Sequence, residues 1–298
     1  MVIGDYLSVP KCLKDEKDCI RSRVDPSGIP SHKLFVFDGF GIDVGHPLGR
    51  RWHLSFYPKL EEGFSFLGLT IEHYCKNFSV VPPKLRPKKI YILGKDRGYF
   101  YPPSPQLFKR DMWKRISDKT GIGFTMGTFQ RSKEIDEQRQ NNDTSGYEKA
   151  KKFADFEPIE GIDDIGTQTR SQFIYQIQNH RAVIGLGWPV QPSTPLEALC
   201  VGTPFINPVW VGRRSQPDRS KWHSQHPYLA HFDPPFVYNV QDQREDDILE
   251  SIEMILKKPL EGRFIPDELK IESYLNRLKD LVEFDWKELS LQKNNKKK

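Results

Sequence analysis

The residues best suited to chemistry in this sequence follow a short apolar run, where a glycine turn leads toward a helix start. Ala182–Ile184 is rich in β-branched residues and indicates a buried parallel strand, and Gly185–Gly187 supplies the turn. In Thr194–Glu197 we expect threonine as the N-cap, proline as the first helical residue and glutamate as the partner in a capping box. Free amide N–H groups and the helix dipole at such a start favour phosphate. An ordinary strand–helix connection explains the bare pattern equally well.

The same stretch continues in a way that fits an α/β unit but not a dinucleotide fingerprint. Gly202 is expected to end the helix in a left-handed conformation, and Phe205–Asn207 resumes a strand. Pro189 stands where a G-x-G-x-x-G motif would already be helical, so that motif is excluded. The pattern therefore predicts an anion-binding turn of another kind.

The elements that must position this turn alternate regularly between strand and helix. Alternation of this kind predicts an α/β fold, a Rossmann-like parallel sheet with helices on both faces, with ligands at the carboxyl ends of its strands. That edge would carry Gly94, Gly185–Gly187 and the loop after Asn207. The predicted strands are 89–93, 123–129, 182–184, 205–207 and 236–240, and the helices are 105–120, 167–180, the one after Thr194, and 242–257. We interpret 131–151 as a flexible insertion and 209–235 as a long loop.

Outside this alternation the sequence predicts less regular structure. Residues 1–32 are polar and broken by prolines, which favours an irregular arm. A strand is expected at 33–37, a loop at 42–60, a helix at 64–78 and terminal helices within 267–290. We therefore divide the chain into an irregular arm (1–32), a less regular segment (33–87), an α/β domain with a Rossmann-like sheet (88–265) and C-terminal helices with a basic tail (266–298).

Charge and hydropathy narrow the possible partners. The 298 residues carry a net charge of +5, much of it in the C-terminal lysine run, which is typical of a solvated tail. No basic patch interleaved with aromatic residues is present, so nucleic-acid binding is disfavoured. No stretch reaches the ~20 apolar residues of a membrane span, and no signal or anchor is visible in the sequence.

Cysteine and histidine spacing argues against a metal site. The four cysteines form no C-x-x-C pair, so structural zinc is not expected, although Cys12 and Cys19 could close a small loop in an oxidising compartment. His223 and His226 lie three apart without a third ligand at compatible spacing. Cys200 is expected to be a small buried residue rather than a nucleophile.

Several short blocks together resemble the C-terminal part of the catalytic region of the N-acetylglucosaminyltransferase V family, the α-1,6-mannosyl-glycoprotein 6-β-N-acetylglucosaminyltransferases. The blocks, all in the family's order, are Phe37–Gly41, Phe64–Gly68, Glu72–His73, Leu93–Lys95, Ile184–Pro189, Pro195–Ala198, Gly202, Phe205–Pro208 and Ser224–Tyr228. The resemblance implies the donor-binding lobe of a GT-B glycosyltransferase with an incomplete N-terminal lobe. In this chain, residues 88–265 would be the nucleotide-sugar-binding domain and residues 33–87 a remnant of the acceptor-side lobe. It also implies inverting transfer of N-acetylglucosamine from UDP-GlcNAc to a mannose of an N-glycan, in the Golgi and with no cofactor or metal.

The resemblance further implies which residues bind the donor. We expect Glu197 to accept hydrogen bonds from the ribose hydroxyls, and arginines to bind the diphosphate. The full predicted donor set is Lys95, Gly185, Leu186, Gly187, Pro195, Leu196, Glu197, Arg213, Arg214 and His226. No acidic residue is assigned as the catalytic base, because the family's base lies upstream of the matched blocks and Asp38 and Asp43 read as turn residues. A catalytically inactive nucleotide-sugar or glycan-binding module is the alternative, and a GT-B enzyme with a different donor is a third interpretation.

Overall fold

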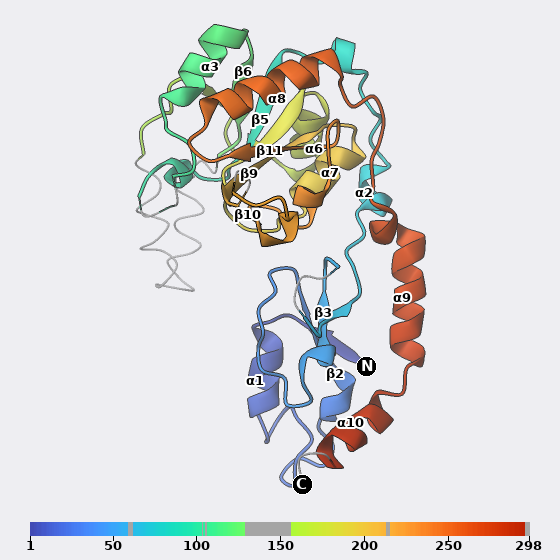
Figure 1. The fold of residues 1–298 in the computed structure, drawn as a ribbon. Coiled ribbons are helices and arrows are strands. Elements are labelled where there is room, and N and C mark those ends of the chain that lie inside the picture. Colours follow the sequence, from blue (N-terminus) through green and yellow to red (C-terminus); the bar gives the residue numbers. More distant parts are fainter. Residues whose placement is uncertain (59–61, 103, 105, 129–155, 213–214, 296–298) are drawn as a thin grey trace. The chain divides into compact units, whose positions relative to one another are not determined.

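The structure, a computed structural model, divides into two compact units (Figure 1). It describes residues 1–58, 62–102, 104, 106–128, 156–212 and 215–295. The central unit is Tyr74–Ile265, and the terminal unit combines Met1–His73 with Pro266–Lys298. The flexible insertion predicted at 131–151 lies outside the described residues.

The central unit is built on a parallel sheet whose strand order is that of a doubly wound fold. Its strands are β5 (Lys89–Leu93), β6 (Gly123–Met126), β7 (Ile162–Asp164), β8 (Ala182–Gly185), β9 (Phe205–Val211), β10 (His223–Ser224) and β11 (Val237–Gln241). The parallel strands lie in the order β7-β6-β5-β8-β9-β11, and β10 pairs antiparallel with the end of β9. The chain winds outward from β5 in one direction and from β8 in the other, so the topological switch point lies between these two strands. The predicted α/β fold with a Rossmann-like sheet is confirmed.

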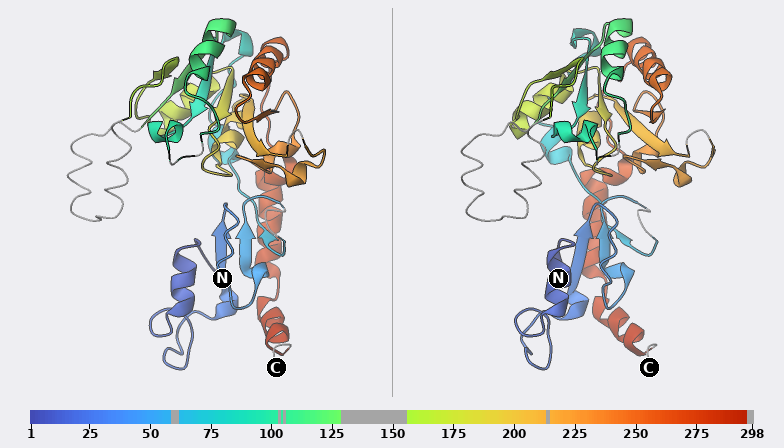
Figure 2. Two further views of the ribbon diagram at one scale, coloured as in Figure 1. Left: turned by 60° about the vertical axis from the view of Figure 1, so that its left-hand side comes forward. Right: turned by 90° about the vertical axis from the view of Figure 1, so that its left-hand side faces the viewer.

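Helices cover both faces of this sheet (Figures 1 and 2). On one face α3 (Met112–Thr120) and α8 (Glu245–Lys257) pack together over the core, and α6 (Arg170–Gln178) and α7 (Thr194–Cys200) lie on the other. Burial follows the helical repeat: α3 buries Trp113 and Ile116, and α8 buries Ile248 and Ile252. Gly121, at φ +67°, ends α3 as the sequence predicts.

The capping box predicted for α7 is wrong, and a capping box occurs at α6 instead. Thr194 is the first residue of α7, preceded by Ser193 as an N-cap with no side-chain hydrogen bond. Glu197 does not reach back to the helix start, because its side chain pairs with Arg170. At α6, by contrast, Thr169 accepts from the Gln172 amide while the Gln172 side chain accepts from the Thr169 amide.

Two predicted helices are shorter than expected. The helix expected at 64–78 is replaced by β4 (Ser65–Phe66) and the short α2 (Glu72–Cys75). Gly68 adopts φ +101°, a left-handed conformation that a right-handed helix cannot contain. The helix expected from 105 begins only at Met112. Near residue 107 the chain instead packs against other loops, since the Leu107 carbonyl accepts from the Gln243 amide.

The terminal unit is a second, smaller parallel α/β structure. Its strands β1 (Val2–Gly4), β2 (Leu34–Asp38), β3 (His53–Ser55) and β4 lie in sequence order. Helix α1 (Ser8–Lys14) packs on β2 through Val9, and α9 (Ile271–Glu283) and α10 (Trp286–Asn295) pack through Leu281 and Trp286 against β2 and β3. Short 3-10 turns occur in both units. Those of the terminal unit are Ser31–Lys33, Arg50–Trp52 and Asp267–Leu269, and those of the central unit are Pro83–Leu85, Arg97–Phe100, Arg219–Lys221 and Leu229–His231.

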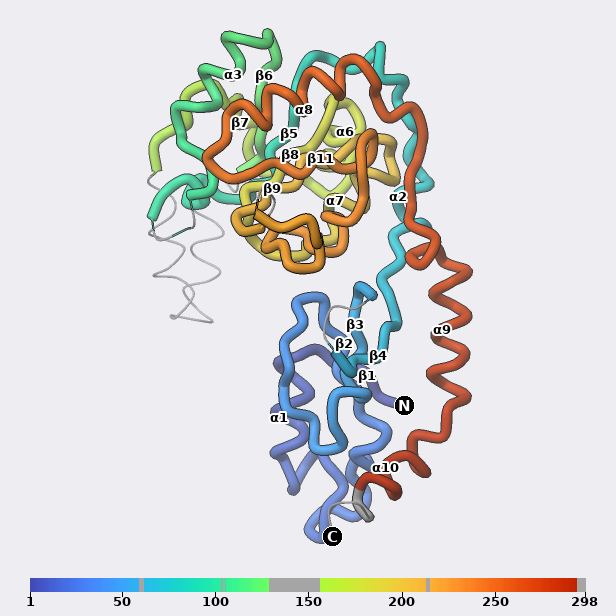
Figure 3. The backbone as a smooth tube through the Cα atoms, in the orientation of Figure 1, coloured from blue at the N-terminus to red at the C-terminus, as the bar shows by residue number. Residues whose placement is uncertain are grey.

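The N-terminal arm is more regular than predicted. Residues 2–14 contain β1 and α1, and β1 extends the sheet by pairing in parallel with β2. A disulfide between Cys12 and Cys19 closes the loop after α1. Figure 3 traces the chain from this unit into the central unit through α2 and back through the segment after α8. The terminal helices therefore complete a unit that the first residues begin.

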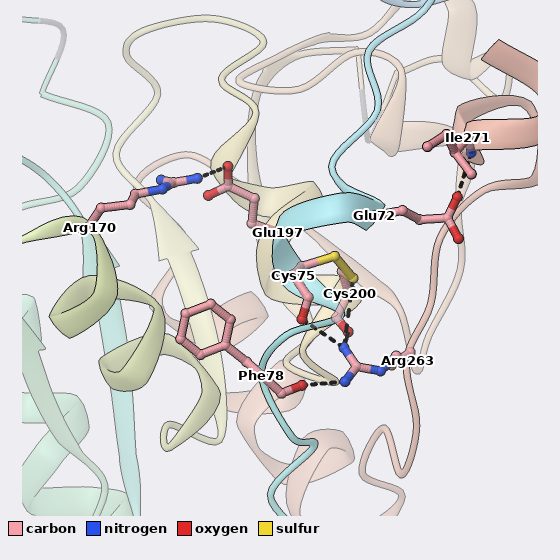
Figure 4. Close-up of a disulfide and its surroundings, with 8 residues drawn as sticks. All are labelled: Glu72, Cys75, Phe78, Arg170, Glu197, Cys200, Arg263 and Ile271. Carbon is pink, nitrogen blue, oxygen red and sulfur yellow. Dashed lines mark hydrogen bonds and ion pairs between the residues drawn. A yellow bond between two sulfur atoms is a disulfide. The ribbon is translucent and has the colours of Figure 1, made fainter. Parts of the chain in front are cut away.

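The C-terminal end of α7 is fixed by a disulfide and by two arginines, Arg263 and Arg86; Figure 4 shows the disulfide and Arg263. Cys200, in the last turn, is bonded to Cys75 of α2, and both cysteines are fully buried. Arg263 donates to the carbonyls of Cys75 and Cys200, at 3.0 and 2.9 Å, and to that of Phe78. Arg86 donates to the carbonyl of Gly202, just beyond the helix, at 2.9 Å. Cations at a helix C-terminus satisfy its unpaired carbonyls and complement its dipole.

Candidate functional site

The candidate site lies where β5 and β8 end, at the switch point of the central sheet. Leu93 of β5 is in register with Gly185 of β8, so the segments that follow both strands emerge at the same edge. They are in contact, because a Cβ on Gly94 would lie 2.9 Å from Leu186 Cδ1. Gly187 is at φ +91°, and a Cβ there would lie 2.2 Å from Leu107 Cδ1. The predicted glycine turn is therefore present and tightly packed.

The turn does not offer the free amide that the sequence pattern suggests. The Gly187 N–H donates to Gln225 Oε1 at 2.9 Å, and Gln225 Nε2 donates to the Pro189 carbonyl at 3.2 Å. A Cβ on Gly185 would fall 1.7 Å from the same Oε1, so glycine is needed there to admit the glutamine. The glycines thus accommodate a protein side chain, and the Gly187 amide, which was expected to face a phosphate, is hydrogen-bonded to Gln225.

Glu197 is the most unusual polar group at this edge. It lies in the first turn of α7, immediately after the loop that leaves β8, and only 4% of its surface is exposed. Its Oε1 forms an ion pair with Nη2 of Arg170 from α6 (Figure 4). Among the described residues, its buried Oε2 has no hydrogen-bond partner. A buried carboxylate oxygen without a donor is costly, so this geometry suits a ligand that brings a hydroxyl or an N–H.

Arg170 was not singled out from the sequence, although its position at the start of a helix is an indication that it has a partner. The residue opens α6, where a cation opposes the positive end of the helix dipole. Its guanidinium lies 5.1 Å from the ring centre of Tyr74, in a cation–π contact, and pairs with Glu197. An arginine at an unfavourable helix position therefore indicates a partner elsewhere, but its partner 27 residues away follows only from the fold.

The other predicted donor residues differ in their exposure, and two of them lie outside the described residues. Pro195 and Leu196 are buried in α7, and Leu186 packs against Gly94. Lys95 is exposed and follows β5 at the same edge as Glu197. Arg213 and Arg214 lie outside the described residues.

His226 fixes a loop and is fully buried. Its Nδ1 accepts from the Leu229 amide at 3.3 Å, and its own amide donates to Asn207 Oδ1 at 3.0 Å. Asn207 also donates to Asn239 Oδ1, which ties β9 to β11. The histidine therefore fixes the loop that follows β10, and its burial lowers its pKa to about 3.

No cluster of three or more histidine, cysteine or acidic residues that could hold a metal occurs in the part of the chain that the structure describes. Asp38, which was expected to be a turn residue, is the last residue of β2 and stabilises the turn that follows, since it accepts from the amides of Phe40 and Ile42 at 3.0 and 2.8 Å. Burial opposes its ionisation, but His53 and these two amides outweigh that effect and lower its pKa.

Three buried histidines predict a stability that depends on pH. Burial lowers the pKa of His46 and His180 to about 4, and that of His226 to about 3. Unfolded histidine titrates near 6.5, so below this pH the unfolded chain binds protons that the folded chain does not. The contribution of these three histidines to the free energy of unfolding is therefore fully present above pH 6.5 and is lost as the pH drops toward 4.

We expect a loss of about 1–2 kcal/mol per histidine at pH 5. Melting temperatures measured at pH 7.5 and pH 5 check this, and His180→Gln should flatten the dependence. A melting temperature that stays constant over this range would contradict the prediction.

Comparison with known proteins identifies the region that contains this site. Residues 158–293 match glycosyltransferase family 18. The chain is 25% identical over 252 residues to an α-1,6-mannosylglycoprotein 6-β-N-acetylglucosaminyltransferase of Caenorhabditis elegans, covering 80% of this chain and 33% of that protein. It is 27% identical over 119 residues to the human enzyme A of the same name, covering 37% of this chain and 16% of that protein. The predicted family resemblance and a glycosyltransferase domain are confirmed.

The chain thus spans about a third of the Caenorhabditis relative and a smaller share of the human one.

Among solved structures, AviGT4, a glycosyltransferase involved in avilamycin A biosynthesis, aligns with a TM-score of 0.42 and 12% identity, covering 91% of this chain and 71% of that one. In the described residues, no helix is both long and apolar enough to cross a membrane. The family 18 match includes α6 and α7, which carry Arg170 and Glu197.

Proposed function

We propose that the central unit binds the nucleotide of UDP-GlcNAc, and that the protein transfers N-acetylglucosamine, with inversion, to a mannose of an N-glycan to form a β-1,6 branch. The observation that carries the proposal is the Glu197 carboxylate, buried at the carboxyl edge of a doubly wound sheet with Oε2 unpaired among the described residues. A ribose offers adjacent hydroxyl donors, which this oxygen can accept. The names of the two relatives support the sugar and the acceptor.

Other features of the chain agree with this function. Lys95 follows β5 at the edge where a diphosphate would lie beside the ribose, and it is exposed and cationic. Two disulfides, Cys12–Cys19 and Cys75–Cys200, suit an oxidising compartment such as the lumen of the secretory pathway. We therefore propose that the protein acts in the Golgi. The base that deprotonates the acceptor hydroxyl is not assigned to a residue.

UDP binding tests the donor site directly. UDP at about 100 times its dissociation constant should stabilise the protein by about 2.7 kcal/mol, which thermal unfolding detects. Glu197→Gln should weaken UDP binding about 10- to 100-fold, because a hydrogen bond to a charged acceptor contributes roughly 1.5–3 kcal/mol. Glu250→Gln, an exposed glutamate on α8, is the matched control and should bind UDP as the wild type does.

The absence of any thermal shift with millimolar UDP would overturn the proposed donor site. Turnover is tested separately, by incubating the protein with UDP-GlcNAc and a mannose-terminated glycan and measuring product by mass spectrometry. Saturable UDP binding without product would show that this chain acts as a nucleotide-sugar-binding module rather than as an enzyme.

A further inference from the structure

We propose that Arg170 is a positioning residue of the nucleotide site, which holds the Glu197 carboxylate so that one oxygen is occupied and the other is kept for the ribose hydroxyls of a nucleoside diphosphate. This inference rests on the function proposed above. It assigns a role to a side chain that belongs to none of the sequence motifs and comes from a different helix than Glu197.

Charge and burial support this role for Arg170. Glu197 is 95% buried by side-chain area, and Arg170 is the cation that the structure places against it. A carboxylate that is removed from water is costly unless a cation pairs with it. The ion pair with Arg170 offsets that cost at Glu197. It engages Oε1, and Oε2 has no hydrogen-bond partner among the described residues.

Arg170 is itself held in place by the Tyr74 ring, which lies next to a disulfide-bonded cysteine. Its guanidinium lies over the Tyr74 ring at 5.1 Å, and the next residue, Cys75, is bonded to Cys200 in the last turn of α7. The contacts therefore close a ring that runs from Glu197 through Arg170, Tyr74 and the disulfide back to the helix that carries Glu197. Such a ring fixes the carboxylate from both ends of α7, which preorganises an acceptor better than a single ion pair.

The position of Arg170 also argues that the pair is not simply an anchor between helices. Half of the Arg170 side chain is exposed, whereas only 5% of the Glu197 side chain is exposed. A cation in the first turn of α6 opposes the helix dipole, and the Thr169–Gln172 capping box already secures that helix start. Arg170 therefore adds little to the stability of α6, and its contacts are directed at Glu197 and Tyr74.

The test compares UDP with 2′,3′-dideoxyuridine diphosphate, which lacks both ribose hydroxyls. Dissociation constants are measured by calorimetry for the wild type, Arg170→Met, Arg170→Lys and Tyr74→Leu. We expect the wild type to prefer UDP at least 10-fold, Arg170→Met to lose this preference, and Arg170→Lys to retain part of it. Tyr74→Leu should reduce the preference without abolishing it. Arg115→Met, which breaks the ion pair with Glu245 between α3 and α8, is the matched control and should keep the full preference.

The outcomes separate the two proposals. A wild-type protein that binds neither nucleotide, or binds both equally, overturns the donor site and this inference with it. A wild type that prefers UDP, together with an Arg170→Met protein that keeps the same preference, overturns only the positioning role. Loss of the preference in Arg170→Met with an unchanged melting temperature supports it, because a purely structural contact would not act on the ribose hydroxyls alone.

Discussion

Removal of the Cys75–Cys200 disulfide should lower the unfolding free energy of the central unit by about 5 kcal/mol. The bond joins residues 125 apart, and the entropy that a cross-link removes from the unfolded chain grows with the length of the loop it closes. Both sulfurs lie in fully buried residues, so Cys75→Ala with Cys200→Ala is the variant that leaves no buried polar group. Urea unfolding followed by tryptophan fluorescence measures the loss.

The other disulfide provides the control for this prediction. Cys12 and Cys19 are seven residues apart and belong to the terminal unit, so replacing both with alanine should cost about 2 kcal/mol there and leave the central unit unchanged. Equal losses for the two variants would contradict the loop-length argument. A central unit with unchanged stability after loss of Cys75–Cys200 would show that the arginine contacts at α7 suffice.

Arg86→Met should destabilise the central unit by about 3 kcal/mol, because a buried acceptor that loses its donor costs roughly 1–3 kcal/mol. Arg86 is 3% exposed and donates to the carbonyls of Val81, His180 and Gly202 at 2.8, 3.3 and 2.9 Å, and to Thr203 Oγ1 at 3.1 Å. These acceptors are three carbonyls and a hydroxyl, and two of the carbonyls follow the ends of α6 and α7, where helix dipoles are negative. Methionine fills the volume but leaves these buried acceptors without a donor.

The protonation of Arg86 does not limit this prediction. Burial lowers its pKa to about 10, with a smaller effect from Arg181, so the side chain is still cationic at pH 7. Arg86→Lys keeps the charge but cannot reach several acceptors in different directions, and an intermediate loss is expected. Chemical denaturation of the three proteins measures the series. A methionine variant within 1 kcal/mol of the wild type would refute the capping role.

The elements that the sequence predicts well are those whose signals are local. The β-branched runs at β5 and β8 are bounded by glycines, and Gly121 ends α3 in the left-handed region, so each is specified within a few residues. The predicted helix at 64–78 failed because its apolar residues suited a helix while Gly68 took a conformation that no helix allows. Strand β3 was missed because three residues carry too little pattern to distinguish a strand from a loop.

The candidate site was predicted only in part, because its contacts join distant segments. Glu197 was singled out correctly as the carboxylate at the start of α7, but the capping partner assigned to it was wrong. Its ion pair with Arg170 and the capture of the Gly187 amide by Gln225 depend on the packing of α6 and of the loop after β10. Sequence spacing specifies which residues share a helix face, but it does not specify which side chain from another element reaches them.

The order in which the chain visits its two units restricts how the protein can be divided for experiments. The family 18 match, residues 158–293, begins inside one unit and ends inside the other. An expression fragment cut at those limits would contain β8 without its neighbour β5, and α9 without the strands it covers. The central unit, residues 74–265, can be expressed as one continuous segment. The terminal unit consists of two segments, so its expression requires a short linker between residues 73 and 266. Boundaries drawn from homology alone would therefore produce two incomplete cores.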